Sequence, residues 1–187
     1  MTPDVRAPGR ALTTKDLRQP KAARVDFEKL ERSPVTVVLD RVSQNYNIGA
    51  ILRLCDAFLV KTVYVCGQEL NLRKRRLVQA ARGTEHWVPI NNELSAVEAV
   101  KKAKGEGRIV IACEQTDAAI APHEINYDVP VCLVFGSEAA GMSKEVIDLA
   151  DVAVAIPLYG MANSINVASA VAIILYQATL HARLLKV

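Results

Sequence analysis

Six short runs of apolar, mostly β-branched residues recur between residues 36 and 156, and they limit the possible folds more than any other feature. The runs are Thr36–Leu39, Thr62–Cys66, His86–Ile90, Arg108–Cys113, Val131–Phe135 and Val152–Ile156. Most are continuous rather than alternating, which is typical of strands covered on both faces. Helical patterns lie between and after them, at Ile48–Leu59, about Leu70–Arg82, Leu94–Lys104, Lys144–Ala150 and Ser164 to about Leu184. Strands that alternate with helices predict an α/β fold: a mostly parallel six-stranded sheet with helices on both faces.

The first 34 residues differ from the rest in composition. They are basic, poor in apolar residues until Val25, and interrupted by several prolines. A short helix is expected at about Val25–Glu31, before Pro34. Because 187 residues fit one domain, we predict a basic N-terminal extension over 1–34 and one compact domain over 35–187.

Several classes of protein are excluded by simple patterns. The longest apolar run has ten residues, Val167–Tyr176, whereas a membrane-spanning helix needs about 20. The N-terminus has no apolar segment of the secretory kind. The four cysteines form no C-x-x-C pair and have no histidine at a ligand spacing, so a metal site is not expected. Unpaired cysteines and the lack of a signal favour a cytoplasmic protein without a membrane partner.

Charge is distributed unevenly along the chain. Residues 1–108 carry a net charge of +8 and residues 109–187 a net charge of −5, within a total of +3. The basic side chains are densest at Arg73, Lys74, Arg75, Arg76 and Arg82. A concentrated basic surface is typical of proteins that bind a polyanion such as RNA. A solvated helix face without a partner would have the same composition, so both interpretations stay open.

Candidate functional residues follow the predicted strands, because ligands of parallel sheets bind beyond the carboxyl ends of the strands. After the first strand, Asn47 is well placed to cap the next helix. Arg53 lies among apolar residues of that helix, where a buried guanidinium needs a partner. It could pair with Asp56, three residues on, or extend into a polar cleft.

Two further loops are candidate ligand sites. Gly136–Ser143 follows the fifth strand and contains Glu138, but it matches neither a dinucleotide-binding nor a P-loop pattern. Beyond the sixth strand, Ser164 is expected to cap the last helix, with Asn166 in its first turn facing a ligand. No hydrolase or metalloprotease motif occurs. An enzyme of this kind would depend on a cofactor that carries activated chemistry.

Three segments together resemble the motifs of one family. Asn47–Arg53 resembles the first motif of the SpoU/TrmH-type RNA ribose 2′-O-methyltransferases of the SPOUT class. Phe135–Glu138 with Gly141 resembles the second, and Ile156–Met161 with Ser164–Val167 the third. The resemblance covers about residues 35–180, and the three motifs occur in the family's order.

The resemblance implies a C-terminal trefoil knot, S-adenosyl-L-methionine as cofactor, and a homodimer that acts on RNA. It places cofactor contacts at Cys113, Gly136, Ile156, Leu158, Ile165 and Asn166. It places catalytic or supporting roles at Asn47, Arg53, Glu138, Ser164 and Asn166. RNA contacts would fall on the basic cluster Arg73, Lys74, Arg75, Arg76 and Arg82.

The leading hypothesis is therefore an S-adenosylmethionine-dependent RNA 2′-O-methyltransferase. Arg82–Val88 resembles the matching stretch of enzymes that methylate a guanosine of the tRNA D-loop, which favours tRNA over ribosomal RNA. A guanidinium keeps its proton in proteins, so we expect Arg53 to stabilise the alkoxide and grip a phosphate rather than act as a base. The alternatives are a non-catalytic RNA-binding factor with the same fold and an unrelated small-molecule α/β enzyme.

Overall fold

The structure is a computed structural model that describes residues 10, 11, 13, 29–93 and 95–184, and side chains only up to residue 180. The chain divides into two units, Met1–Glu31 and Arg32–Val187. The account below concerns the second. Residues 25–28 of the short helix expected at Val25–Glu31 lie outside the described residues, and the basic extension over 1–34 stays a prediction.

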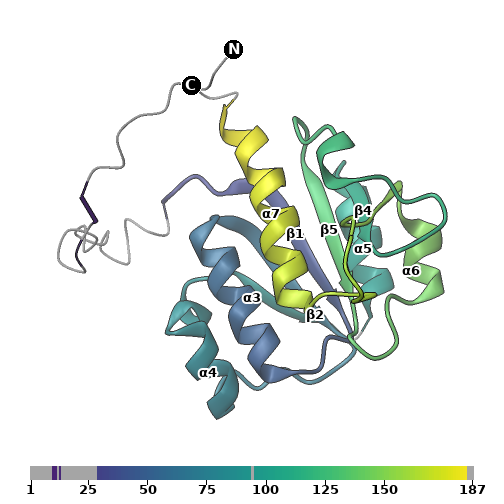
Figure 1. Ribbon diagram of the computed structural model, residues 1–187. Helices are drawn as coiled ribbons and strands as arrows, with labels where there is room; N and C mark the ends of the chain where they lie inside the picture. The colour runs from purple at the N-terminus through teal and green to yellow at the C-terminus, as the bar shows by residue number, and fades with distance from the viewer. Residues whose placement is uncertain (1–9, 12, 14–28, 94, 185–187) are drawn as a thin grey trace. The chain divides into compact units, whose positions relative to one another are not determined.

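Strands and helices alternate through the second unit (Figure 1). In chain order they are β1 (Ser33–Asp40), α3 (Asn45–Ala57), β2 (Val60–Cys66), α4 (Arg75–Ala81), the 3-10 turn η1 (Thr84–His86), β3 (Ile90–Glu93), α5 (Ala96–Gly105), β4 (Ile109–Cys113), the 3-10 turn η2 (Pro122–Glu124), β5 (Val131–Gly136), α6 (Lys144–Leu149), β6 (Val152–Val154) and α7 (Val167–Leu184).

The six strands form one sheet in the order β3-β2-β1-β5-β4-β6. Every pair of neighbouring strands is parallel. The prediction of a parallel six-stranded sheet with helices on both faces is confirmed. The trefoil knot stays a prediction from the family resemblance.

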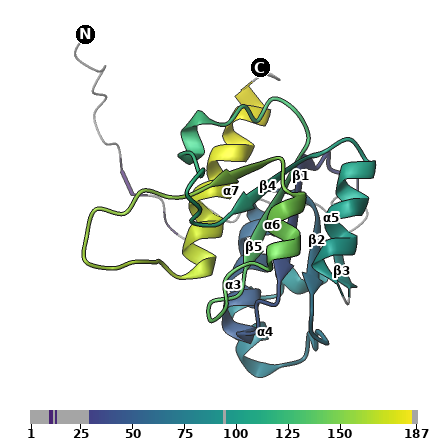
Figure 2. The same ribbon diagram turned by 90° about the vertical axis from the view of Figure 1, so that its right-hand side faces the viewer.

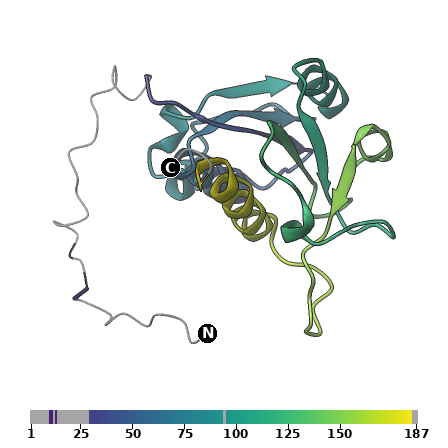
Figure 3. The ribbon, with the colours of Figure 1, turned by 90° about the horizontal axis from the view of Figure 1, so that it is seen from above.

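The sheet has a separate apolar core on each face. Along β1, Val37 and Leu39 belong to the core formed with α3, α4 and α7, whereas Val38 belongs to the core formed with α5 and α6. Figures 2 and 3 show the sheet between these two groups of helices. This double coverage explains the continuous apolar runs, because both sides of a central strand must exclude water.

The strand order reverses beside β1, which determines where a ligand can bind. From β1 the chain moves outward to β2 and β3, then crosses to β4 and returns to β5 on the other side of β1. Asp40 at the end of β1 pairs with Gly136 at the end of β5. The loops that leave these two ends diverge and open a crevice at the carboxyl edge of the sheet.

One predicted strand is wrong. Within the apolar run His86–Ile90, His86 ends the turn η1, residues 87–89 form a loop, and only Ile90 belongs to a strand. The third strand is Ile90–Glu93. This strand lies at the edge of the sheet, where polar side chains can find partners. Asn92 donates to the backbone oxygen of Val65 at 2.8 Å, and Asn91 donates to the hydroxyl of Thr62 at 2.9 Å. Two asparagines therefore occupy a strand that a search for apolar residues does not detect.

Helix α4 is shorter than its apolar pattern predicts. We expected a helix from Leu70, but α4 begins at Arg75. The side-chain oxygen of Asn71 accepts the backbone N–H of Arg73 at 2.9 Å, and its carbonyl accepts that of Lys74 at 3.1 Å. These bonds fold residues 71–74 into a turn, which competes with helix at asparagine.

Helices α3 and α4 approach closely at Gly49. A methyl group there would lie 2.3 Å from the backbone oxygen of Leu77 and 2.9 Å from the Ala80 side chain. Alanine is about 1 kcal/mol more favourable than glycine inside a helix. Glycine at position 49 is therefore explained by the close approach of α4 and not by helix propensity. The close contact places the end of α4 beside α3.

We predict that Gly49→Ala lowers the free energy of unfolding by about 1–3 kcal/mol, because the added methyl group overpacks a backbone contact. Urea unfolding measures the change. The matched control is Gly105→Ala in α5, where a methyl group meets no atom within 4 Å. That variant should be up to about 1 kcal/mol more stable. Equal effects at the two sites would contradict the packing argument.

Candidate active site

A cavity of about 450 Å³ opens at the carboxyl edge of the sheet, where the strand order reverses. We call it the strand-end cavity. Its lining comes from the start of α3, the ends of β4, β5 and β6, and the start of α7. The lining residues are Gln44, Asn47, Cys113, Glu114, Gln115, Phe135, Gly136, Ser137, Glu138, Gly141, Val154, Ala155, Ile156, Leu158, Ser164, Ile165, Asn166, Val167, Ala170 and Ile174.

The residues expected to contact a cofactor meet in this cavity. All six line it, namely Cys113, Gly136, Ile156, Leu158, Ile165 and Asn166. They come from β4, from β5 and from the loop between β6 and α7. Segments separated by more than 50 residues in sequence thus form one wall because parallel strands end at the same edge.

A hydrogen-bonded chain of side chains joins the three motifs. The amide nitrogen of Asn47 donates to Glu138 Oε1 at 2.6 Å. The amide oxygen of Asn47 accepts a bond from the amide nitrogen of Asn166 at 3.0 Å. The same amide nitrogen also donates to Gln44 Oε1 at 3.4 Å. Asn47 is buried, so an unpaired amide there would be costly, and these bonds fix its orientation. One residue from each motif therefore lies in a single network.

The expected capping roles of Asn47 and Ser164 are wrong. Helix α3 begins at Asn45, which places Asn47 inside the first turn. Helix α7 begins at Val167, and the side-chain oxygen of Asn166 accepts the backbone N–H of Ala168 at 2.8 Å. Asn166 is thus the residue that caps α7. Ser164 lies two residues before the cap, exposed, in the cavity wall.

The loop after β5 is narrow, and it requires glycine at its base. Ser137 and Gly141 exchange backbone hydrogen bonds of 3.0 and 2.8 Å. A methyl group on Gly136 would lie 2.4 Å from the backbone nitrogen of Met142. Gly141 has φ 65°, in the left-handed region that favours glycine. This tight loop carries Glu138 toward Asn47.

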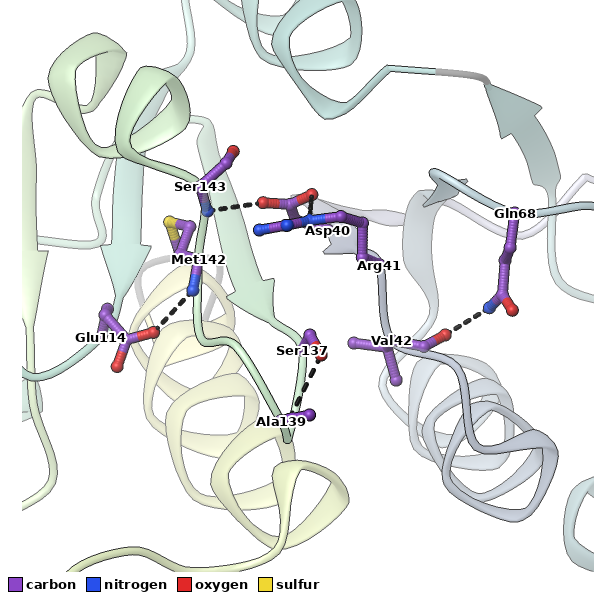
Figure 4. Close-up of polar contacts among 9 residues, drawn as sticks. All are labelled: Asp40, Arg41, Val42, Gln68, Glu114, Ser137, Ala139, Met142 and Ser143. Carbon is purple, nitrogen blue, oxygen red and sulfur yellow. Dashed lines mark hydrogen bonds and ion pairs between the residues drawn. The ribbon is translucent and has the colours of Figure 1, made fainter.

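Two carboxylates hold the second half of the same loop (Figure 4). Asp40 accepts the backbone N–H of Ser143 at 2.8 Å, and Glu114 accepts that of Met142 at 2.9 Å. Asp40 ends β1 and Glu114 directly follows β4. Neither residue belongs to the three motifs. Their position directly at strand ends is the signal that could have identified them.

Arg53 does not lie in the strand-end cavity. It is exposed and lines a neighbouring hollow of about 830 Å³, which we call the arginine groove. Arg82 lines the same groove, so two cations face it. Among the described residues, Arg53 forms no ion pair with Asp56, and the hypothesis of a structural pair is wrong. The groove and the cavity share Gln44, Asn47 and Asn166.

The rest of the basic cluster lies apart from both hollows. Arg73 and Lys74 precede α4 and Arg75 and Arg76 begin it, and all four side chains are exposed. Arg82 ends the same helix with φ 58°. The cluster therefore forms a basic surface that continues from the arginine groove along α4.

The cysteines are protonated thiols. Burial raises the pKa of Cys66 to about 12 and that of Cys132 to about 12. Burial also raises the pKa of Cys113, in the cavity wall, well above its usual value.

Within residues 29–93 and 95–184, no group of three His, Cys, Asp or Glu side chains could hold a metal ion. No helix in that part of the chain is long and apolar enough to cross a membrane.

Comparison with known families agrees with this geometry. The model of the SpoU rRNA Methylase family matches residues 34–176. The chain belongs to this family, and the resemblance seen in its three motifs is confirmed.

Individual relatives cover most of the chain. The tRNA (guanosine(18)-2′-O)-methyltransferase of Escherichia coli (strain K12) is 35% identical over 157 residues, which are 83% of this chain and 68% of that protein. Among solved structures, the A. aeolicus TrmH/SpoU tRNA modifying enzyme matches with a TM-score of 0.77 and 31% identity, over 87% of this chain and 82% of that one. The AdoMet bound rRNA methyltransferase from Sinorhizobium meliloti matches with a TM-score of 0.73 and 27% identity, over 83% and 60% of the two chains.

We predict that Asn47→Asp destabilises the protein by about 1–3 kcal/mol, because it places a second carboxylate against Glu138 and removes a buried donor. Denaturant unfolding measures the loss. The control is Asn45→Asp, in the same turn of α3 and outside the network. A negative charge at a helix N-terminus is neutral or mildly favourable. A similar loss in both variants would mean that the network does not hold the site together.

Proposed function

We propose that this protein is an S-adenosylmethionine-dependent RNA methyltransferase that transfers a methyl group to a ribose 2′-hydroxyl of tRNA. The observation that carries the proposal is the network of Asn47, Glu138 and Asn166. It connects a cavity sized for a small molecule to a groove lined by two arginines.

The strand-end cavity fits the cofactor. Its volume of about 450 Å³ falls within the range of about 300–1,000 Å³ that is usual for small-molecule sites. Its lining combines apolar side chains such as Ile156 and Leu158 with polar ones such as Asn47 and Asn166. The residues proposed to hold the cofactor are Cys113, Gly136, Ile156, Leu158, Ile165 and Asn166. When bound there, the cofactor would supply an activated methyl group on a sulfonium.

Arg53 is proposed to act on the RNA. In the arginine groove its planar guanidinium can grip a phosphate by two hydrogen bonds and stabilise the alkoxide that develops on the ribose. It keeps its proton, so the hydroxyl proton must leave through another group, such as a phosphate or a water. Asn47, Glu138 and Asn166 are proposed to hold the reacting groups in line, with Ser164 supporting them from the cavity wall.

Several observations support tRNA as the substrate. Relatives named as tRNA methyltransferases cover more than four fifths of this chain. The basic surface along α4 and the arginine groove are proposed to bind the RNA backbone. Ribosomal RNA is the second candidate, favoured by the structural relative named as an rRNA methyltransferase.

We place the protein in the cytoplasm, with residues 1–34 as a basic extension of the methyltransferase domain at 35–187.

Helix α7 supports a homodimer. Ile173, Tyr176 and Leu180 are 46%, 53% and 37% exposed, and their spacing places them in one stripe along the helix. A row of exposed apolar side chains on a long helix is typical of an interface. We propose that this stripe packs against a second copy of the chain.

The proposed reaction predicts transfer of label from radiolabelled S-adenosylmethionine into a ribose 2′-O-methyl nucleoside of unmodified tRNA. Arg53→Ala should lower the rate about 10²–10³-fold, the effect of losing one electrostatic stabiliser. The rate of Arg53→Lys should lie between the rates of wild type and Arg53→Ala. Lys101→Ala, an exposed residue of α5 on the opposite face of the sheet, should leave the rate unchanged.

Three results would contradict the proposal. Full activity of Arg53→Lys would show that the planar guanidinium is not needed. Cofactor binding without label in tRNA or in ribosomal RNA would favour a non-catalytic RNA-binding factor. Label in ribosomal RNA alone would favour the second candidate.

The homodimer predicts that Ile173→Asp shifts the chain from dimer to monomer in size-exclusion chromatography with light scattering, because the interface would bury a charge. Val129→Asp is the control, since Val129 is exposed to a similar degree, 38%, in the loop before β5. A wild-type chain that elutes as a monomer would rule out the dimer.

A further inference from the structure

The strand-end cavity and the arginine groove carry opposite charges. Among the described residues, the charged side chains that line the cavity are Glu114 and Glu138, both acidic. Those that line the groove are Arg53 and Arg82, both basic. The neutral amides Gln44, Asn47 and Asn166 form the wall between them. The groove is thus matched to a polyanion and the cavity to a cation.

We infer that Glu114 is a specificity-determining residue that makes the cavity favour the cationic methyl donor over its neutral product. The inference rests on the proposed function. S-adenosylmethionine carries a sulfonium charge, which is lost in S-adenosylhomocysteine when the methyl group leaves. The two ligands otherwise share their groups, so a charge in the wall is what can separate their affinities.

Two hydrogen bonds fix the carboxylate group of Glu114 in the cavity wall. One carboxylate oxygen accepts the backbone N–H of Gln115 at 3.0 Å, and the other accepts that of Met142 at 2.9 Å. The side chain is half-buried, so its charge is less screened than one in open water.

Glu138 contributes less to this preference. It is exposed, and one of its oxygens is already used by Asn47. Water screens an exposed charge more strongly than a half-buried one. Glu114 is also one of the two carboxylates that hold the loop after β5 (Figure 4). The same side chain therefore shapes the cavity and sets its charge.

Glu114 could act by shaping the cavity or by its charge, and the ratio of the dissociation constants of the two ligands distinguishes these roles. Isothermal titration calorimetry of wild type and Glu114→Gln, with S-adenosylmethionine and with S-adenosylhomocysteine, gives the affinity for each ligand. We expect the product-to-donor ratio of dissociation constants to fall about tenfold in Glu114→Gln, which corresponds to about 1.4 kcal/mol. Glutamine retains one acceptor oxygen for the N–H of Met142, and it loses the charge together with the acceptor for the N–H of Gln115.

Asp40→Asn is the matched control. Asp40 holds the neighbouring N–H of Ser143 but does not line the cavity. This variant should change both affinities in the same proportion and leave their ratio unaltered. Glu138→Gln should lower the ratio by less than Glu114→Gln does.

The possible results are distinct. A ratio that stays constant in Glu114→Gln, even with weaker binding of both ligands, would reduce Glu114 to a structural clamp and overturn the inference. Should this variant fail to fold, wild type still provides a test. The cationic amine analogue sinefungin should bind wild type more tightly than the neutral product, and the reverse order overturns the inference. A wild type that binds no S-adenosylmethionine would refute the proposed function itself.

Discussion

The site depends on the side-chain amide of Asn47, which uses its donor and its acceptor at the same time. It donates to Glu138 and accepts from Asn166. Because the amide is buried, each bond also prevents the cost of an unsatisfied polar group. The two partners lie on the loop after β5 and at the start of α7. A single residue of α3 therefore sets the mutual positions of all three motifs, and with them the boundary between cavity and groove.

This boundary separates two electrostatic environments. Acidic side chains face the cavity, basic side chains face the groove, and uncharged amides lie between them. Charges of opposite sign in adjacent hollows would normally pair and neutralise each other. Here uncharged amides form the wall between the acidic and the basic lining. A cation and a polyanion can then bind side by side, as methyl transfer to RNA requires.

The sheet followed from the sequence because continuous apolar runs are local patterns, whereas the residues expected in the cavity wall came from the resemblance of three motifs to a known family. Properties that depend on tertiary contacts did not follow from the sequence. Arg53 was expected to be buried, but the buried residues of α3 are Asn47, Ile48, Gly49, Ile51, Leu52 and Cys55. They follow helical spacing, and Arg53 lies off that stripe. Likewise, Asp40 and Glu114 can accept backbone N–H groups of the loop after β5 only because β1, β5 and β4 are neighbours in the sheet.

The bonds that shape the site have a consequence for how the chain folds. They join residues far apart in sequence: 91 positions separate Asn47 from Glu138, 103 separate Asp40 from Ser143, and 119 separate Asn47 from Asn166. Closing such long loops costs entropy that only a formed sheet repays. The helices and the first strand pairs can form early, but the site is completed late in folding. A partially folded chain would carry its basic surface before it can bind a methyl donor.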